Sequence, residues 1–599
     1  MSHVCPIAPL SGATSPATAG HELYRWQLDA LISWVRCGRR GVIEAVTGSG
    51  KTDVAIAAIA DALRRDRFVL VVVPSRVLME QWHGRLTTAI PGARIGRLGD
   101  SGKDVPDSCD VLVATRHSAA AYKPLPPGGA GGLLVAYECH GMGGRILRRA
   151  LLARYEERLG LTATLERSDD AVTELLLPYF GGICYRYGFE EAIGDGVCAR
   201  PRVAFVGVAL SVDERAEYAA IEDRLVTARH RLRLVRDMPL EPFGDFLAAV
   251  AHLAERDSGA DGRAARDYLD AFSKRRQIVA QTIGKYELLG DLAPAIKDAD
   301  GALVFTETVR AANHAINRLD PLVSIDLITG STARRQRREI LDDLRVRRLD
   351  AVAAPRVLDE GIDVPDANLG VVMSASRTRR QMIQRMGRIL RRKQAGIAAR
   401  FVIMFAKDTL EDPANRVERD GFLDEIERIS QASGIFDSAR FEDLGAFLAE
   451  PGPDIIPEPE HLESYFRAAA SAGIDLHAPF TDSTVEALSD ALGVETAYAL
   501  VAFARTGARM HDDAAIARLG ARLPATGTTA PFLEPELAHL PHVTKPKVVP
   551  KRLSTGQMAL EIARIGDAWR ISCTGCGEAS PLVQFRWQVL DQTVACRCE

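Results

Sequence analysis

The sequence contains no long uninterrupted run of apolar residues and no large excess of charge of either sign. A membrane-spanning helix needs about 20 largely apolar residues in a row, so we expect no association with a membrane. The formal net charge is −4 at pH 7, which excludes a protein that binds nucleic acid through an overall positive field. Binding to a nucleic-acid strand would have to come from a local groove.

Cysteine is also sparse, with ten residues among 599, and six of these stand alone in the sequence. Scattered single cysteines exclude a disulfide framework and indicate a reduced, cytoplasmic setting. Residues 1–20 are rich in Ser, Ala, Pro, Thr and Gly and are expected to form a mobile tail, not a signal peptide. A chain of this length should hold several domains, on the order of four.

The most informative stretch is a glycine-rich turn between an apolar run, residues 41–46, and a helical pattern, residues 53–64. It reads Ala45-Val46-Thr47-Gly48-Ser49-Gly50-Lys51-Thr52. A strand, a glycine turn and a helix start form a phosphate-binding loop, because backbone N–H groups converge on phosphate oxygens at the helix N-terminus. Lys51 is predicted to reach the β- and γ-phosphates of ATP, and Thr52 to bind Mg²⁺. The alternative is a glycine turn that merely precedes a helix, since Ala45 replaces the first glycine of the general pattern.

Ahead of this loop, Tyr24 and Gln27 open a predicted amphipathic helix. A glutamine amide offers both a donor and an acceptor, so Gln27 is a candidate for reading the adenine base, with Tyr24 in the same nucleotide site. The helix alone favours the plainer interpretation of a surface glutamine.

Strands and helices alternate through the first 200 residues, and a short polar cluster follows several of the apolar strands. These clusters are Pro74-Ser75-Arg76, Thr115-Arg116, Tyr137-Glu138-Cys139-His140 and Thr162-Ala163-Thr164. Such alternation predicts a doubly wound parallel sheet. Sheets of this kind bind ligands at the carboxyl ends of their strands, so we expect the clusters to line one site.

With the phosphate loop, the ordered clusters resemble motifs I, Ia, Ic, II and III of superfamily 2 helicases, specifically the XPB-like group of DNA helicases and translocases. The resemblance implies that Glu138 polarises the water that attacks ATP. It implies that His140 and the Thr-Ala-Thr segment link the nucleotide state to strand binding. It also implies nucleic-acid contacts from Ser75, Arg76, Thr115 and Arg116.

Motif II departs from the family pattern at Tyr137, where the family has an aspartate that holds Mg²⁺. A neutral phenol cannot replace that charge, and its ring is far bulkier. Three explanations stay open: an inactivating substitution made on purpose, natural loss of ATPase activity, or altered handling of the metal. Because Glu138 and the whole phosphate loop are present, we favour a recent change on an active background. The chain is predicted to bind ATP better than it hydrolyses it.

Residues 201–432 carry a second set of motifs, after a predicted helical insertion at about 211–285. The strand 302–305 resembles motif IV. Thr329 and Gly330 resemble a DNA-backbone contact of the second lobe. The run Leu358-Asp359-Glu360-Gly361-Ile362-Asp363 resembles motif V, which implies that Gly361 and Asp363 lie beside the nucleotide.

A run that resembles motif VI closes this second set, and it reads Gln381-Met382-Ile383-Gln384-Arg385-Met386-Gly387-Arg388-Ile389-Leu390-Arg391. Gln384 can orient water or a phosphate oxygen. Arg388 and Arg391 are three residues apart on one helix face and are candidates for arginine fingers on the γ-phosphate. Since Lys51 belongs to the other lobe, ATP would draw the lobes together and hydrolysis would release them.

The last third carries fewer signals. Residues 433–545 contain a proline-rich linker and Ala-rich helices without chemistry, and are interpreted as an accessory module open to protein partners. Residues 555–599 hold two close cysteine pairs, made by Cys573, Cys576, Cys596 and Cys598. Four thiolates predict a structural Zn²⁺ site, and the alternative is redox-active or incidental pairs.

The predicted fold is α/β, with two tandem RecA-like doubly wound parallel-sheet lobes at residues 21–200 and 201–432, a helical insertion, a helical C-terminal module and a small zinc-ribbon-like terminus. The predicted function is an ATP-dependent DNA helicase or translocase using ATP and Mg²⁺. RNA is not excluded as a partner, and 3′→5′ tracking is implied by the resemblance alone. Two other functions stay open: an ATP-gated nucleic-acid clamp, and a motor subunit of a restriction or phage-defence complex.

Overall fold

The structure is a computed structural model, and it describes most of the chain between residues 23 and 573. The described residues are 23–99, 102–129, 131–167, 169–235, 238–239, 243–355, 367–373, 387, 389–413, 426–454, 459, 463–476, 478, 480–503, 512–523, 553–555, 558–565 and 568–573. The predicted motif V residues Gly361 and Asp363, together with Gln384 and Arg388 of motif VI, lie outside them.

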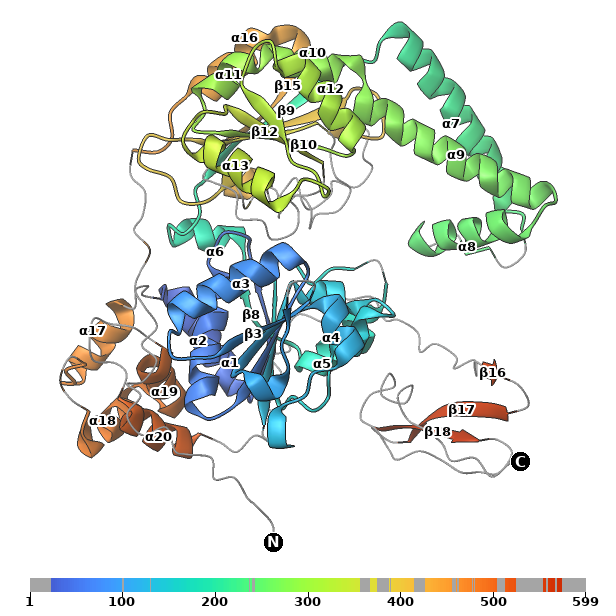
Figure 1. The fold of residues 1–599 in the computed structure, drawn as a ribbon. Helices are drawn as coiled ribbons and strands as arrows, with labels where there is room; N and C mark the ends of the chain where they lie inside the picture. Colours follow the sequence, from blue (N-terminus) through green and yellow to red (C-terminus); the bar gives the residue numbers. More distant parts are fainter. Residues whose placement is uncertain are drawn as a thin grey trace.

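The first lobe, blue to cyan in Figure 1, is built on an eight-stranded sheet in the order β4-β3-β5-β2-β6-β7-β1-β8. Its strands are β1 (Arg40–Ala45), β2 (Phe68–Val73), β3 (Ile95–Gly99), β4 (Gly102–Lys103), β5 (Val111–Thr115), β6 (Gly132–Tyr137), β7 (Glu157–Thr162) and β8 (Ile183–Tyr187). All neighbours pair in parallel except β3 and β4. Every residue of β2 is buried, as expected for a parallel sheet covered by helices on both faces.

The helices of this lobe connect the strands. They are α1 (Arg25–Arg36), α2 (Lys51–Arg64), α3 (Arg76–Ala89), α4 (Arg116–Tyr122), α5 (Leu177–Phe180) and α6 (Phe189–Gly194). Helices α2, α3 and α4 begin shortly after the carboxyl ends of β1, β2 and β5. Three helix N-termini, each with a partial positive charge, are therefore gathered along one edge of the sheet.

The second lobe is a seven-stranded sheet in the order β11-β12-β10-β13-β14-β9-β15, and all of its neighbours pair in parallel. Its strands are β9 (Pro201–Val208), β10 (Ala302–Thr306), β11 (Ile325–Leu327), β12 (Ala351–Pro355), β13 (Leu369–Val372), β14 (Ala399–Ala406) and β15 (Ala432–Asp437). Its helices include α10 (Ile283–Asp291), α11 (Ala293–Asp298), α12 (Val309–Leu319), α13 (Arg334–Arg345) and α16 (Phe441–Ala449). Two parallel-sheet lobes of the RecA type confirm the predicted fold class.

A helical arm lies between β9 and α10. It consists of α7 (Val212–Leu232), α8 (Phe243–Arg256) and α9 (Ala260–Gln281). The three helices pack around a small apolar core that includes Leu225, Phe246 and Tyr268. The arm projects away from the second sheet in Figure 1.

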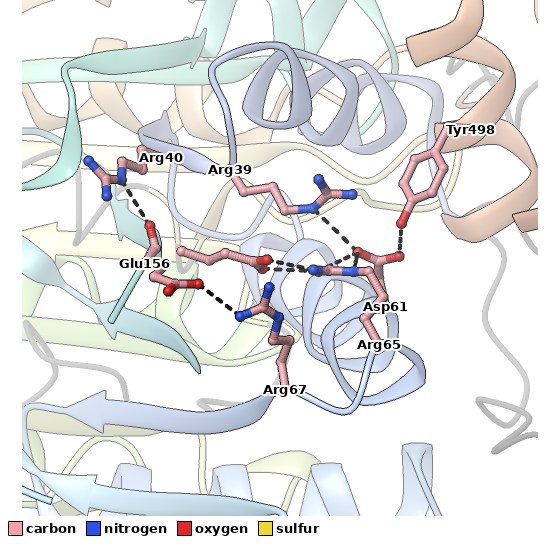
Figure 2. A network of polar contacts seen from close by, with 8 residues as sticks. Arg39, Arg40, Asp61, Arg65, Arg67, Glu156 and Tyr498 are labelled. Atoms are coloured by element: carbon pink, nitrogen blue, oxygen red, sulfur yellow. Dashed lines mark hydrogen bonds and ion pairs between the residues drawn. The ribbon is translucent and has the colours of Figure 1, made fainter. Parts of the chain in front are cut away.

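The C-terminal helices dock on the first lobe, although they follow the second lobe in sequence (Figure 1). They are α17 (Glu463–Ser471), α18 (Asp482–Leu492), α19 (Val494–Phe503) and α20 (Asp513–Arg522), and α19 packs on α1 and α2. Asp61 of α2 is fully buried and accepts hydrogen bonds from the Tyr498 hydroxyl and from Nη2 of Arg65 at 2.8 Å. Arg39 Nε lies 3.7 Å from the same carboxylate (Figure 2). A buried charge thus joins the module to the helix that begins at the phosphate loop.

A small antiparallel sheet follows, made of β16 (Leu553–Thr555), β17 (Met558–Ile565) and β18 (Ala568–Cys573). Cys573 ends β18, whereas Cys576, Cys596 and Cys598 lie outside the described residues, so the zinc site stays a prediction. Within the described ranges, no group of three or more His, Cys, Asp or Glu side chains is placed to hold a metal ion. No helix in those ranges is sufficiently long and apolar to cross a bilayer.

Candidate active site

The glycine-rich turn forms a tight loop between β1 and α2. Gly48 and Gly50 have φ angles of 92° and 96°, a left-handed conformation that side chains with a Cβ rarely adopt. Gly50 is also the residue that precedes α2. The two glycines therefore shape the loop, and their bare backbone leaves room for an anion at the helix N-terminus.

Lys51 is buried and turned toward its own loop. Its Nζ donates to the carbonyl oxygens of Ala45 at 2.6 Å and Val46 at 3.1 Å, and the Ser49 hydroxyl donates to Val46 as well at 2.8 Å. The buried Thr47 hydroxyl has no hydrogen-bond partner among the described residues. A loop with an ammonium group held close by and an unsatisfied hydroxyl fits a phosphate group, because both can bond to its oxygens.

Gln27 joins the start of α1 to this loop. Its Oε1 accepts from the backbone N–H of Tyr24 at 2.8 Å, and its Nε2 donates to the carbonyl oxygen of Gly50 at 3.0 Å. A primary amide has two donors and two acceptor lone pairs, so each end keeps capacity for one further bond. Gln27 is therefore positioned beside the loop, and adenine recognition by Gln27 and Tyr24 remains a proposal.

Tyr137 ends β6 and packs against the helix that carries motif Ia. Its ring meets the buried Trp82 ring of α3 edge to face, with centroids 5.5 Å apart. The phenol brings no carboxylate to the place where the family holds Mg²⁺. Mg²⁺ prefers hard, charged oxygen ligands in octahedral geometry, so the donor set at this position does not fit the metal.

Glu138 is held in a strained conformation at the end of the same strand. Its φ and ψ are 54° and 53°, and its side chain is almost entirely buried. A left-handed conformation in a residue other than glycine is costly and is retained mainly at functional sites. This backbone conformation places the buried Glu138 carboxylate at the carboxyl edge of the sheet, where the sequence predicts the catalytic group.

His140 and Thr162 connect Glu138 to the end of β7. His140 Nδ1 lies 3.4 Å from Glu138 Oε2 and 3.0 Å from Thr162 Oγ1. The Thr162 hydroxyl donates to the Thr164 carbonyl at 2.7 Å, and its oxygen also lies 3.5 Å from Glu138 Oε2. Motifs II and III are therefore joined by side-chain hydrogen bonds.

Arg167 extends this connection and was not singled out by the sequence analysis. Its Nη1 donates to the His140 carbonyl at 2.8 Å, and its other nitrogens bind the carboxylate of Asp169 at 2.6 and 2.7 Å. The hydrogen bond from Arg167 lowers the pKa of Asp169. Its position three residues after the Thr-Ala-Thr segment is the signal that points to it.

The predicted nucleic-acid contacts of the first lobe lie at helix starts. The Ser75 hydroxyl accepts from Leu78 N at 3.4 Å and caps α3, while the Thr115 hydroxyl accepts from Ser118 N at 3.2 Å and caps α4. Arg76 is the exposed first residue of α3. A Cβ on Gly141 would lie 2.5 Å from Nη1 of Arg116, so Arg116 lies directly over the segment that follows motif II.

In the second lobe, Thr329 and Gly330 form a turn after β11. The Thr329 N–H donates to Thr332 Oγ1 at 2.8 Å, and Nη2 of Arg337 donates to the Thr329 carbonyl at 3.0 Å. Gly330 is exposed, with open space where a Cβ would be. Hydrogen bonds therefore hold the turn at Thr329, while Gly330 stays accessible to a ligand.

The two lobes meet at the phosphate loop. A Cβ on Gly387 would lie 2.4 Å from Thr47 Cβ and 2.5 Å from Thr47 O, and a Cβ on Gly48 would lie 2.7 Å from Gly387 O and 3.6 Å from Arg391 Cγ. Gly387 and Arg391 belong to the run that resembles motif VI. Residues of motif VI therefore lie directly against the phosphate loop.

The segment between the lobes reinforces this contact. The Ala199 N–H donates to the Leu390 carbonyl at 2.7 Å, and Cys198 forms an antiparallel bridge with Arg391. Burial raises the pKa of the Cys198 thiol to about 12, although the nearby Lys51 ammonium opposes the shift. The end of motif VI is therefore tied to the connection between lobes and placed near Lys51.

Comparison with known proteins is consistent with this site. The family model of the type III restriction enzyme res subunit matches residues 20–167, and that of the helicase conserved C-terminal domain matches residues 284–393. The chain is 31% identical over 378 residues to a DNA 3′-5′ translocase XPB2 of Sulfurisphaera tokodaii, covering 62% of this chain and 79% of the relative.

Two longer relatives are similar over a comparable part of the chain. A putative DNA 3′-5′ helicase Rad25 of Halobacterium salinarum is 29% identical, covering 59% of this chain and 49% of the relative. The helicase/translocase subunit XPB of the general transcription and DNA repair factor IIH of Danio rerio is 26% identical, covering 64% of this chain and 44% of the relative. The chain thus spans about half the length of these two relatives.

Proposed function

We propose that this chain, which belongs to the XPB-like group of superfamily 2 DNA helicases and translocases, couples ATP in the cleft between its lobes to movement along DNA. The observation that carries the proposal is the contact of Gly387 with Thr47 and Gly48. Because the phosphate loop and motif VI share one site, a nucleotide bound there would touch both lobes. The 3′→5′ direction in the names of the relatives is proposed for this chain as well.

ATP binding would begin with a rearrangement of Lys51. Its ammonium group must leave the carbonyl oxygens of Ala45 and Val46, which lie 2.6 and 3.1 Å away, and bond to phosphate oxygens instead. The Thr47 hydroxyl gains a partner in the same step. Arg391, already beside Gly48, would then approach the γ-phosphate from the second lobe, because a guanidinium stays charged and binds oxyanions well.

Hydrolysis would depend on Glu138, His140 and Thr162. Glu138 would orient the attacking water and accept its proton. Since His140 lies between Glu138 and Thr162, a shift of either neighbour would change the position of the histidine. This provides a physical link from the nucleotide to motif III and, through the His140 carbonyl, to Arg167.

Tyr137 places a limit on this activity. A Mg²⁺ ion would have the Thr52 hydroxyl and the nucleotide phosphates as ligands, without the carboxylate that the family supplies at position 137. We therefore assign no step to the metal and propose that the chain binds ATP better than it hydrolyses it. The same feature favours the second candidate function, a clamp that holds DNA while ATP is bound.

The experiment that tests the proposal measures ATP binding and steady-state ATP hydrolysis with single-stranded DNA, duplex DNA and RNA in turn. A motor predicts that DNA raises the rate of hydrolysis. A clamp predicts that ATP tightens DNA binding while hydrolysis stays at its unstimulated rate. If ATP and DNA do not affect one another at all, both functions are wrong.

A motor subunit of a restriction or phage-defence complex remains a further alternative, supported by the match to the type III restriction enzyme res subunit model over residues 20–167. No nuclease signature is recognisable in the chain, so cleavage would need another protein. Co-purification of a nuclease with the natively expressed chain would support this assignment.

A further inference from the structure

Three neighbouring arginines outside the recognised motifs form an exposed basic loop just after motif II. We define the arginine loop as residues 144–149, with Arg145, Arg148 and Arg149 as its basic members. Arg145 and Arg149 are exposed, and Ile146 between them is 66% exposed. The loop therefore presents one apolar side chain together with its basic ones.

These three guanidiniums differ from many other arginines of the first lobe because they lack acidic partners. Over the described ranges, none of the three makes a side-chain hydrogen bond or an ion pair. Ten other arginines of the lobe pair with carboxylates: Arg25, Arg39, Arg64, Arg65, Arg67, Arg85, Arg94, Arg97, Arg167 and Arg186. In a chain with a net charge of −4, a cluster of unneutralised positive charge stands out as a site for an anionic ligand.

The backbone holds this loop in a defined shape. The Arg148 N–H donates to the Gly144 carbonyl at 2.9 Å, and the Arg149 N–H donates to the Ile146 carbonyl at 3.2 Å. A 3-10 turn at Leu147–Ala150 follows, and its last residue is fully buried. The arginines are therefore presented from a rigid turn, which lowers the entropy lost when they bind a ligand.

The loop also lies next to a predicted nucleic-acid contact. Its 3-10 turn packs on α4, the helix that begins with Arg116. Arg116 in turn lies over Gly141, three residues before the loop. The arginine loop and Arg116 of motif Ic therefore form neighbouring positive charges on the first lobe.

We propose that the arginine loop binds the phosphate backbone of DNA and extends the strand path beyond motif Ic, with Ile146 against the sugars or bases. The inference rests on the proposed function, because it adds a contact to the same nucleic-acid path. The position of the loop favours DNA phosphates over an acidic protein segment, because the loop adjoins Arg116, a predicted nucleic-acid contact.

The test measures binding of a fluorescein-labelled duplex oligonucleotide to the full chain over a series of NaCl concentrations. One variant combines Arg145→Gln, Arg148→Gln and Arg149→Gln. The matched control combines Arg36→Gln, Arg440→Gln and Arg522→Gln, which removes the same charge from three exposed positions on other elements. Arg145→Gln alone serves as a second variant, because this side chain is exposed and makes no side-chain hydrogen bond or ion pair within the described ranges.

Each phosphate contact contributes about −0.9 to the slope of log affinity against log salt. The loop variant is expected to lose about two to three from the magnitude of that slope and about 10- to 100-fold in affinity at low salt. For Arg145→Gln alone, the magnitude of that slope should fall by about one. The control variant should have the same slope as the unmodified chain.

Equal slopes for the loop variant and the control would overturn the inference, while DNA-stimulated ATP hydrolysis would leave the proposed function standing. If the unmodified chain fails to bind DNA at any salt concentration, the proposed function and the inference both fail. If the slopes fall as expected, the loop is assigned as part of the DNA path.

Discussion

The carbonyl oxygen of Gly387 lies 2.7 Å from the point where Gly48 would carry a Cβ atom. This contact brings the second lobe onto the phosphate loop at a place where two bare backbones meet. The nucleotide site is therefore shared between the lobes, and its geometry depends on glycine on both sides.

Gly387→Ala is expected to impair closure of the lobes. The added Cβ would overlap Thr47, and overpacking of this kind costs about 1–3 kcal/mol. In the Tyr137→Asp background, nucleic-acid-stimulated hydrolysis should fall about 5- to 150-fold, with little change in the stability of either lobe, since alanine suits a helix. Steady-state ATPase assays and thermal unfolding measure the two effects.

Gly84→Ala is the control for this substitution, because Gly84 lies in α3 with open space around its Cβ position. It should leave the rate of hydrolysis unchanged and raise the stability slightly, by about 0.5–1 kcal/mol, because alanine is favoured over glycine inside a helix. Full activity of Gly387→Ala would show that the contact does not form during turnover.

Thr162→Val is expected to uncouple ATP hydrolysis from DNA binding. The valine keeps the shape of the side chain but loses the hydroxyl that bonds to His140 and donates to the Thr164 carbonyl. Stability should fall by about 1 kcal/mol, and stimulation by DNA should fall about 5-fold or more. The rates with and without DNA are compared in the Tyr137→Asp background, where turnover is expected to be measurable.

Thr409→Val matches this change in the second lobe, because the Thr409 hydroxyl also donates to a carbonyl, that of Ala406, at 2.7 Å. Thr409→Val should lower the free energy of unfolding by a similar amount and leave the stimulation of hydrolysis by DNA unchanged. If both variants retain stimulation, His140 and Thr162 do not transmit the nucleotide state.

Tyr498→Phe is expected to loosen the C-terminal helices from the first lobe. Burial and the neighbouring Asp61 carboxylate raise the pKa of Tyr498, so the hydroxyl remains a donor to a buried charge at neutral pH. A hydrogen bond to a charged group is worth about 1.5–3 kcal/mol. Chemical denaturation should show an earlier transition for the module.

Tyr122→Phe is the control for the loss of a hydroxyl, because Tyr122 is 68% exposed and should not change stability. Unchanged unfolding of Tyr498→Phe would mean that Arg39 and Arg65 satisfy Asp61 without the tyrosine.

Local chemistry made part of the site predictable from sequence. Gly48, Gly50 and Lys51 determine the loop by their own conformational freedom and charge, so the turn could be predicted without knowledge of the fold. The alternation of strands and helices predicted the first parallel sheet for the same reason, since each element depends on neighbours close in sequence. The second parallel sheet was expected from the family resemblance.

Contacts between distant segments could not be predicted in this way. In the sequence, Asp61 has the features of an ordinary residue of an amphipathic helix. No nearby residue indicates that its partner is Tyr498, 437 residues away. The 433–545 region was therefore expected to carry no chemistry. The packing of Gly387 on Thr47 likewise follows from how two lobes close, which no local pattern encodes.

The most direct test of the shared nucleotide site compares ATP hydrolysis on duplex DNA by Tyr137→Asp, Tyr137→Asp/Lys51→Ala and Tyr137→Asp/Arg391→Ala. We predict that Tyr137→Asp raises the rate at least about 10-fold over the unmodified chain, which corresponds to about 1.4 kcal/mol of barrier. Removing either Lys51 from one lobe or Arg391 from the other should return the rate to the starting value. No gain from Tyr137→Asp, or a gain that survives the loss of Arg391, would contradict this prediction.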